Sequence, residues 1–357
     1  MDRMEKDTRS TMTGTAELPG GAPDPAQQLF HIATGYVLSS ALHVVTDVGV
    51  ADHLGGGPKP VAELAKATGT NEDALYRIMR ALASVGIFEE VGPRTFALTP
   101  PAELLQRAHP RSARDMMVFI ADPFHFRVYA DLEESLKTGR PCGEKTVGMP
   151  VFQYFEKHPE YSEIFNRAMT TMSAAVIPAA IEAYDFSGIG VLVDVAGGHG
   201  EVLMSILRAN PHMRGILMDL EHVLAGATAR LAAAGVADRV QMVPGDFFKT
   251  VPAGGDAYIM KHIIHDWDDE RAGLIFRNIH HALGGKRNGK VILLEGVIQP
   301  GNEPGLGKIM DLEMMTLPGG RERTAEEFRA LFDRAGFRMT SITPTKSPLA
   351  VIEAVLK

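Results

Sequence analysis

The sequence predicts an α/β protein in two parts: a doubly wound parallel sheet in the carboxyl-terminal half and a smaller, mainly helical domain before it. Between residues 191 and 295, five short apolar segments alternate with helical spacers, which is the pattern of a parallel sheet covered by helices. Before residue 110, apolar residues recur with a helical period until one segment alternates with a period of two. A chain of 357 residues, 45% hydrophobic and 22% charged, is long enough for two domains of an ordinary soluble enzyme.

The start of the chain has the composition of a disordered leader, which we expect over residues 1–25. It mixes charged residues, Thr, Gly and Pro without the apolar centre of a signal peptide. No apolar run approaches the roughly eighteen residues that cross a bilayer, so we expect a cytoplasmic protein with no membrane partner. The single cysteine, Cys142, excludes an intramolecular disulfide and a zinc site built from several cysteines, which also fits a reducing cytoplasm.

A mainly helical region that ends near residue 109 opens the folded chain. Residues 29–54 are apolar with a helical period and should bury a broad face. A second helix, over residues 71–82, has acids in its first turn and Thr70 or Asn71 as its cap.

A hairpin follows, because residues 86–91 and 95–99 alternate with a period of two on either side of a glycine and a proline. Helices followed by a hairpin over residues 26–109 form a winged-helix arrangement, which commonly binds DNA. Between Ala26 and Glu103, however, five basic residues face eight acidic ones, a net charge of −3, and the whole chain carries −8. DNA contacts need the opposite sign, so we expect no nucleic-acid partner and interpret the apolar first helix as a dimer contact.

The next region, residues 110–185, is mostly helical and rich in Met and Phe. Side chains of these types at helical spacing usually pack in a core, and a minority of them would line an aromatic pocket. We expect this region to bridge the two domains and to line a substrate, and we expect the catalytic domain over residues 186–357.

The stretch from Val191 to Gly200, VLVDVAGGHG, is typical of a buried parallel strand that ends in a glycine turn before a helix. Such a turn lets a nucleotide approach main-chain amides at a helix amino terminus. The third glycine of a dinucleotide fingerprint is missing, and so is a phosphate loop. Asp194, inside the strand just before the glycines, would repel a pyrophosphate but suits an amino group or a sulfonium. This favours S-adenosylmethionine, and a glycine turn without any ligand is the alternative.

Two further strands end in acids that suit the rest of such a nucleotide. Residues 215–220 form a second strand, and Asp219 lies about twenty residues past the glycine turn, where a carboxylate accepts both ribose hydroxyls. Residues 239–243 form a third strand, after which Asp246 would take the adenine amino group and an aromatic residue would stack on the ring. Ligands of doubly wound sheets bind at the carboxyl ends of the strands, so these residues should share one edge.

The fourth and fifth strands, residues 256–261 and 290–295, place titratable residues at the same edge. His265 follows the fourth strand and, with an ordinary pKa near 6.5, is able to accept a proton at neutral pH. Glu295 ends the fifth strand, and Glu322 lies in a loop just before another helix. Two carboxylates beside an imidazole would orient it and stabilise its protonated form.

A metal centre is the competing use of such a cluster. The chain lacks the His-Glu-x-x-His pattern, and the acids at residues 268–270 are typical of the charged first turn of a helix. We therefore expect base catalysis by His265 without a metal. An ordinary loop histidine is the remaining alternative.

Four motifs in this order give the chain a resemblance to a known family. They are DVAGGHG at residues 194–200, PGDFF at 244–248, a lysine followed by HDWDD within 261–269, and GGRERT at 319–324. Over nearly its whole length the chain resembles the plant caffeate-type and bacterial antibiotic-tailoring O-methyltransferases, which use S-adenosylmethionine. The resemblance implies a Rossmann-like methyltransferase domain, a winged-helix dimerisation domain before it, and a homodimer.

The resemblance also assigns roles to individual residues. His265 would be the general base, with Glu295 and Glu322 flanking it and Asp266 beside it. The residues implied to hold the cofactor are Ser173, Asp194, Gly197, Gly198, Asp219, Leu220, Asp246, Phe247 and Lys261. Those implied to contact the substrate are Phe165, Met169, Trp267, Asp311 and Met315. The match departs at Ala196 and His199, where the family more often has Gly and Thr.

The activity implied is direct displacement, in which the sulfonium methyl group passes to a phenolic hydroxyl of a small aromatic metabolite. A phenol has a pKa near 10, so a positioned histidine lowers the cost of removing its proton. Two alternatives come from other classes: the same fold and cofactor used for hydroxylation or decarboxylation, and a winged-helix regulator that senses a ligand. A nicotinamide dehydrogenase fits least, because the third glycine is missing.

Overall fold

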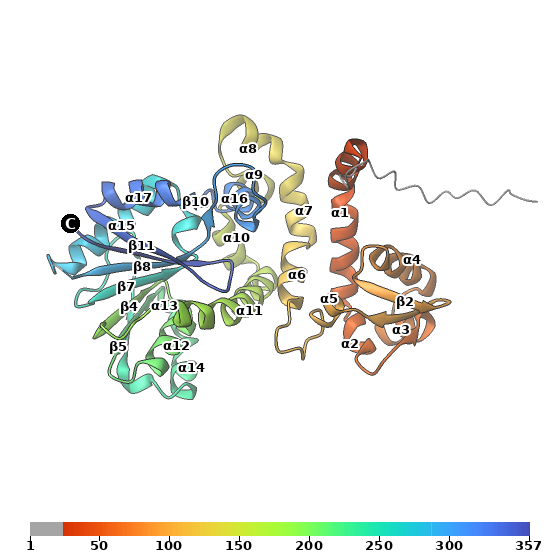
Figure 1. The fold of residues 1–357 in the computed structure, drawn as a ribbon, viewed down its shortest axis with the longest axis horizontal. Helices are drawn as coiled ribbons and strands as arrows, with labels where there is room; N and C mark the ends of the chain where they lie inside the picture. The colour runs from red at the N-terminus through yellow and green to blue at the C-terminus, as the bar shows by residue number, and fades with distance from the viewer. Residues whose placement is uncertain (1–23, 287) are drawn as a thin grey trace, which may run out of the picture. The chain divides into compact units, whose positions relative to one another are not determined.

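The computed structural model describes residues 24–286 and 288–357, and the chain divides into two compact units, Met1–Ala121 and Asp122–Lys357. Figure 1 draws the elements of both. The leader expected over residues 1–25 lies outside the described residues, except for its last two, where the first helix begins.

The amino-terminal unit combines helices with a small antiparallel sheet. Its elements are α1 (Pro25–Asp47), α2 (Val50–Leu54), β1 (Lys59–Pro60), α3 (Val61–Thr68), α4 (Glu72–Ala83), β2 (Phe88–Gly92), β3 (Thr95–Leu98), α5 (Pro100–Glu103) and α6 (Arg114–Ile120). The strands lie in the order β1, β3, β2, and the antiparallel pair β2 and β3 is the predicted hairpin. Asn71 caps α4, as expected, by accepting a 3.0 Å hydrogen bond from the backbone N–H of Ala74.

Helix α1 differs from the expectation of a broad buried face. Only Val45 and Thr46 are buried in it, while Phe30 is 67% exposed and Ile32 is 74% exposed. Of the helices that the structure describes, α1 also meets the length and composition of a membrane span, with a mean hydropathy of 1.3 over an 18-residue window. This helix qualifies by its average hydropathy, although polar residues interrupt it and it holds no unbroken apolar run of eighteen residues. An apolar stripe indicates that a face is covered, but not whether the same chain covers it.

The carboxyl-terminal unit is built on a seven-stranded sheet. In spatial order its strands are β11 (Phe337–Pro344), β12 (Ala350–Leu356), β8 (Lys290–Glu295), β7 (Ala257–Lys261), β4 (Val191–Val195), β5 (Arg214–Asp219) and β6 (Val240–Pro244). The five predicted strands are all present and parallel to one another. An antiparallel hairpin of β11 and β12, which was not predicted, continues the sheet beyond β8.

Helices occupy the remainder of this unit. They are α7 (Pro123–Ala130), α8 (Leu132–Thr138), α9 (Cys142–Val147), α10 (Val151–Lys157), α11 (Pro159–Ala183), α12 (Glu201–Ala209), α13 (Glu221–Leu224), α14 (Ala227–Ala233), α15 (Asp269–Leu283), α16 (Leu306–Thr316) and α17 (Ala325–Arg334). Two apolar cores lie on the two faces of the sheet: α11, α12 and α14 pack into one, and α15 and α17 into the other (Figure 1). Leu192 and Val193 enter different cores because successive strand residues point to opposite faces.

Candidate active site

The glycine turn after β4 lies against the end of β5. Gly198 has a φ of +59°, and its backbone N–H donates to Asp219 Oδ2 at 2.7 Å. A side chain at Gly197 would place its Cβ 2.5 Å from the carboxyl carbon of Asp194, so only glycine fits there. Ala196, where the resembled family more often has glycine, takes a left-handed φ of 56°. The turn therefore keeps its backbone close to two carboxylates.

Both of these carboxylates lie in surroundings that disfavour their charge. Burial raises the pKa of Asp194 to about 7, and its Oδ2 is buried without a hydrogen-bond partner in the described part of the chain. Burial also raises the pKa of Asp219, whose Oδ1 accepts the backbone N–H of Leu220 at 2.7 Å. The Leu220 side chain is exposed, so Leu220 contacts Asp219 through its backbone N–H. A buried carboxyl oxygen without a partner suits a polar or cationic ligand group.

Aromatic rings gather where β6 ends. Asp246 Oδ1 accepts the backbone N–H of Phe248 at 2.9 Å, which holds the turn. The ring centroid of Phe247 lies 4.7 Å from that of Phe248 and 6.1 Å from that of Trp267. The Trp267 indole N–H is buried and has no hydrogen-bond partner among the residues described. These rings could stack on a flat ligand and offer one unused donor.

Further rings connect this group to α10 and α11. The ring centroid of Phe152 lies 6.4 Å from that of Trp267 and 6.4 Å from that of Phe165. Met169 is half-buried and Ser173 is buried, at successive intervals of four residues after Phe165. This spacing places Phe165, Met169 and Ser173 along one face of α11.

His265 lies in a single 3-10 turn, Ile264–Asp266, after β7. Its Nδ1 is 2.8 Å from Glu322 Oε1 and 3.9 Å from Glu295 Oε2, and its Nε2 is 3.5 Å from Asp266 Oδ1. Burial alone would lower the pKa of His265, but the charges of Glu295 and Asp266 and the hydrogen bond to Glu322 raise it to about 9. The structure brings together the four residues that were expected at a reacting centre.

The two glutamates also hold backbone segments. Glu295 is fully buried, and its Oε1 accepts the backbone N–H groups of Ile263 at 3.2 Å and Ile264 at 2.9 Å. Burial raises the pKa of Glu295. The backbone N–H of Glu322 donates to Asp311 Oδ1 at 2.9 Å, so Asp311, expected beside a substrate, helps to hold Glu322.

Two other predicted residues lie on the elements that bound this cluster. Lys261 ends β7, and burial lowers its pKa while the charges of Asp194 and Glu295 oppose that change. Met315 is half-buried on α16, four residues after Asp311 and therefore on the same side of that helix.

Two residues that were not predicted also contact the centre. His262 has a left-handed φ of 52°, and its Nδ1 lies 3.4 Å from His265 Nδ1. With Glu295, the two histidines bring three potential metal ligand atoms within 4.8 Å of one another. Arg323 is fully buried and donates to the carbonyl oxygen of Ile264 at 3.0 Å. The sequence signal that could have found them was their position next to predicted motif residues: Arg323 lies inside GGRERT, and His262 directly follows Lys261.

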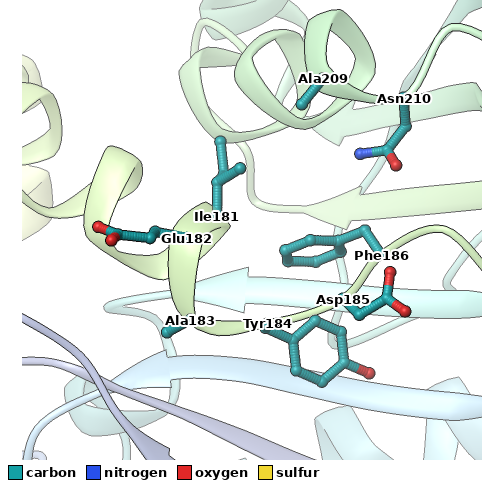
Figure 2. Close-up of a pocket in the computed structure, with 8 residues that line it drawn as sticks. All are labelled: Ile181, Glu182, Ala183, Tyr184, Asp185, Phe186, Ala209 and Asn210. Atoms are coloured by element: carbon teal, nitrogen blue, oxygen red, sulfur yellow. The ribbon is translucent and has the colours of Figure 1, made fainter.

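A pocket elsewhere in this unit does not belong to the cluster. Figure 2 shows it between the end of α11, the residues that lead into β4, and the end of α12. Because α12 ends and β4 begins there, this is the amino-terminal edge of the strands, opposite the edge that carries His265. Its lining residues are Ile181, Glu182, Ala183, Tyr184, Asp185, Phe186, Ala209 and Asn210.

Comparison with known proteins identifies the family. Residues 129–338 match the family model of an O-methyltransferase domain, and residues 30–107 match that of an O-methyltransferase dimerisation domain. A phenazine O-methyltransferase from Lysobacter antibioticus is 41% identical over 94% of this chain and 97% of that protein. The chain belongs to the O-methyltransferase family.

Further relatives of this O-methyltransferase agree with the assignment. The 3-amino-4-hydroxybenzoate 4-O-methyltransferase of Streptomyces cremeus is 36% identical over 94% of this chain and 92% of that protein. The structure of a methyltransferase from calicheamicin biosynthesis, in its S-adenosylhomocysteine-bound form, is 34% identical with a TM-score of 0.83, covering 94% of this chain and 100% of the other. The predicted fold and the predicted use of S-adenosylmethionine are confirmed, and these comparisons do not support a hydroxylase, a decarboxylase or a regulator.

Proposed function

We propose that this O-methyltransferase methylates a phenolic hydroxyl of a small aromatic metabolite, with His265 as the base that takes the hydroxyl proton. The relatives named above act on a phenazine and on an aminohydroxybenzoate, which are both flat aromatic acceptors. The observation that carries the proposal is the 2.8 Å contact between His265 Nδ1 and Glu322. It engages one ring nitrogen, and the other, Nε2, with Asp266 Oδ1 3.5 Å away, would take the substrate proton.

The residues at the glycine turn fit the methyl donor. The unpartnered Asp194 Oδ2 and the close backbone at Gly197 suit its amino acid part, and the Asp219 carboxylate suits its ribose. Asp246 and Phe247 would contact the adenine, with further contacts from Ser173, Gly198, Leu220 and Lys261. When bound, S-adenosylmethionine supplies a methyl carbon that is already electrophilic. The chain therefore has two tasks: to orient the acceptor, and to take its proton.

The carboxylates around His265 make it a better match for a phenol than an ordinary histidine. The pKa of His265 is about 9, and a phenol has a pKa near 10. The transfer of the phenol proton to His265 is therefore less unfavourable than its transfer to a histidine with an ordinary pKa near 6.5. The cost is that most His265 is protonated at neutral pH, so turnover should rise as the pH approaches 9.

We propose that this chemistry needs no metal. His265 Nδ1 already lies 2.8 Å from Glu322, and a metal bound at that nitrogen would separate the imidazole from its orienting carboxylate. Trp267, Phe165, Met169 and Met315 would hold the flat acceptor beside His265, and Asp311 would support them through Glu322.

We further propose that the enzyme is a cytoplasmic homodimer in which the exposed apolar face of α1 packs against a second copy. The match of residues 30–107 to a dimerisation domain supports this assignment. In functional terms, residues 26–109 would serve dimerisation, residues 110–185 would line the substrate, and residues 186–357 would carry catalysis.

The test of the catalytic role is His265→Ala. We expect the variant to bind S-adenosylhomocysteine with unchanged affinity in calorimetry but to lose methyl transfer to a phenolic phenazine by roughly 100-fold or more, since a positioned base contributes about that much. Mass spectrometry of the product should show the gain of one methyl group with the parent enzyme. His281→Ala, an exposed histidine on α15, is the matched control. Near-normal turnover of His265→Ala would contradict the proposal.

A further inference from the structure

The loop that carries His265 is held by a second segment, residues 320–323. At Gly320, an added Cβ would overlap the carbonyl oxygen of His265 and the carbonyl carbon of Asp266. Residue 320 therefore has to be glycine, because two backbones touch there. The backbone N–H of Arg321 donates to the same carbonyl oxygen of His265 at 2.8 Å. The two segments are joined at the catalytic turn by both packing and a hydrogen bond.

Arg323 makes the remaining contacts of this segment. Its side chain is fully buried, and Nη1 donates to the carbonyl oxygens of Ile264 at 3.0 Å and Arg321 at 3.3 Å. Nη2 donates to the carbonyl oxygen of Trp267 at 2.9 Å and to Asp269 Oδ1 at 2.9 Å. Nε donates to Asp269 Oδ1 at 3.1 Å. A guanidinium has five N–H donors, and these five contacts give each of them an acceptor.

The acceptors show what the guanidinium holds. Ile264 directly precedes His265, and Trp267 follows two residues after it, so Arg323 contacts the backbone on both sides of the catalytic turn. A buried guanidinium is costly unless all its donors are paired, which means that the turn and Arg323 maintain each other. The adjacent residue, Glu322, holds the imidazole ring itself.

We propose that Gly320 and Arg323 are positioning residues for methyl transfer, which set the placement of His265 relative to its carboxylates and to the acceptor. Arg323 holds the backbone, Glu322 holds the ring, and Gly320 allows the two segments to meet. The inference rests on the proposed role of His265 as the base. A displacement of about 1 Å at a reacting group costs up to roughly 100-fold in rate. A rigid, planar guanidinium that fixes the position of His265 therefore compensates for the unfavourable burial of the Arg323 charge.

The experiment compares Arg323→Lys, Arg323→Met and Asp269→Asn with the parent in the full-length enzyme. Lys keeps the charge but cannot reach the separate acceptors with one rigid group, and Met removes the donors altogether. Arg334→Lys is the matched control, because Arg334 also donates to Asp269, at 2.8 Å, from an exposed position. Turnover is divided by the number of S-adenosylhomocysteine sites that calorimetry counts, so unfolded protein does not enter the result.

We expect kcat per binding site to fall roughly 10-fold in Arg323→Lys, further in Arg323→Met, and less in Asp269→Asn, while the Kd for S-adenosylhomocysteine stays within twofold. The pH at which kcat/KM levels off should also fall, because the carboxylates no longer hold their distances from His265. Arg334→Lys should match the parent in both respects.

Two outcomes separate this inference from the proposed function. If His265→Ala loses turnover but Arg323→Lys keeps both the parent rate per site and the parent pH profile, Arg323 has only a structural role and the inference is wrong. If Arg323→Met does not fold, Asp269→Asn tests the inference instead, because it removes the charge that pairs with Arg323 and Asp269 is partly exposed. If His265→Ala itself keeps its turnover, the proposed function is what fails.

Discussion

At the scale of single residues, the reacting centre consists of an imidazole among three carboxylates. Glu322, Glu295 and Asp266 all lie within 3.9 Å of a His265 ring nitrogen. Together they favour the charged imidazolium more than burial disfavours it, which places the pKa of His265 at about 9. Removing one of these charges should therefore lower the pH at which the rate levels off.

Glu322→Gln tests this effect. Gln keeps an oxygen that accepts the Nδ1–H but removes a negative charge, so the pKa of His265 should fall by about one unit. The rise of kcat/KM with pH, which should extend to about 9 in the parent, should end at a lower pH in the variant. Steady-state rates measured from pH 6 to 10 give the rise of kcat/KM and the pH at which it levels off in each enzyme.

Glu326→Gln, an exposed acid on the neighbouring helix α17, is the charge-matched control and should leave the profile unchanged. If Glu322→Gln levels off at the same pH as the parent, the carboxylate does not set the basicity of His265.

At the scale of elements, a buried ion pair joins α7 to α16. His125 Nδ1 lies 2.8 Å from Asp122, which also caps α7, and its Nε2 lies 2.8 Å from Glu313 on α16. Burial alone would lower the pKa of His125, but the two carboxylates raise it to about 9. Since α16 also carries Asp311, which holds Glu322, this pair supports the reacting centre from a distance.

This ion pair should make the free energy of unfolding depend on pH. The pKa of His125 is higher in the folded state than its unfolded value near 6.5, so its contribution is complete below pH 6.5 and is lost as the pH rises through about 9. His125→Gln should lower the free energy of unfolding by about 3 kcal/mol at pH 6, because it leaves buried carboxylates without a cation. The difference from the parent should shrink at pH 10. Urea unfolding at both pH values measures it.

His212→Gln, an exposed histidine, should change stability little at either pH. A stability difference for His125→Gln that stays equal at pH 6 and pH 10 would mean that the charge on His125 does not contribute.

At the scale of the whole molecule, the chain consists of two compact units with separate cores, and the exposed helix α1 belongs to the amino-terminal one. Its apolar side chains are spaced for burial, yet Phe30 and Ile32 are mostly exposed within a single chain. Large exposed apolar faces mark interaction sites. The match of residues 30–107 to a dimerisation domain supports the proposal that a second copy of this chain covers this face.

The double substitution Phe30→Asp and Ile32→Asp should separate the proposed dimer, since each places a charge in an apolar interface. Sedimentation velocity should give about twice the 38.6 kDa chain mass for the parent and a single chain mass for the variant. Val91→Asp, at an apolar side chain exposed on β2, should leave the dimer intact. A monomeric parent enzyme would rule out the proposal.

Much of the fold was predictable because its signals are local. The five parallel strands, the Asn71 cap and the hairpin of β2 and β3 each depend on the spacing of neighbouring residues. The antiparallel hairpin of β11 and β12 was not predicted. This hairpin joins the sheet through the pairing of β12 with β8, and these two strands lie far apart in the sequence.

The sequence by itself determined the strands, the glycine turn, the acids at the strand ends and the family that these motifs identify, because each depends on residues close together in the chain. Only the tertiary structure decided that α1 leaves its apolar face exposed and that His262 lies beside His265. It also decided that Arg323 contacts the backbone on both sides of the catalytic turn. The contacts of Arg323 join segments about sixty residues apart, and the exposure of α1 depends on what covers a surface. The contact of His262 with His265 spans only three residues, but it depends on the left-handed backbone at His262. The spacing of neighbouring residues carries no information about any of these.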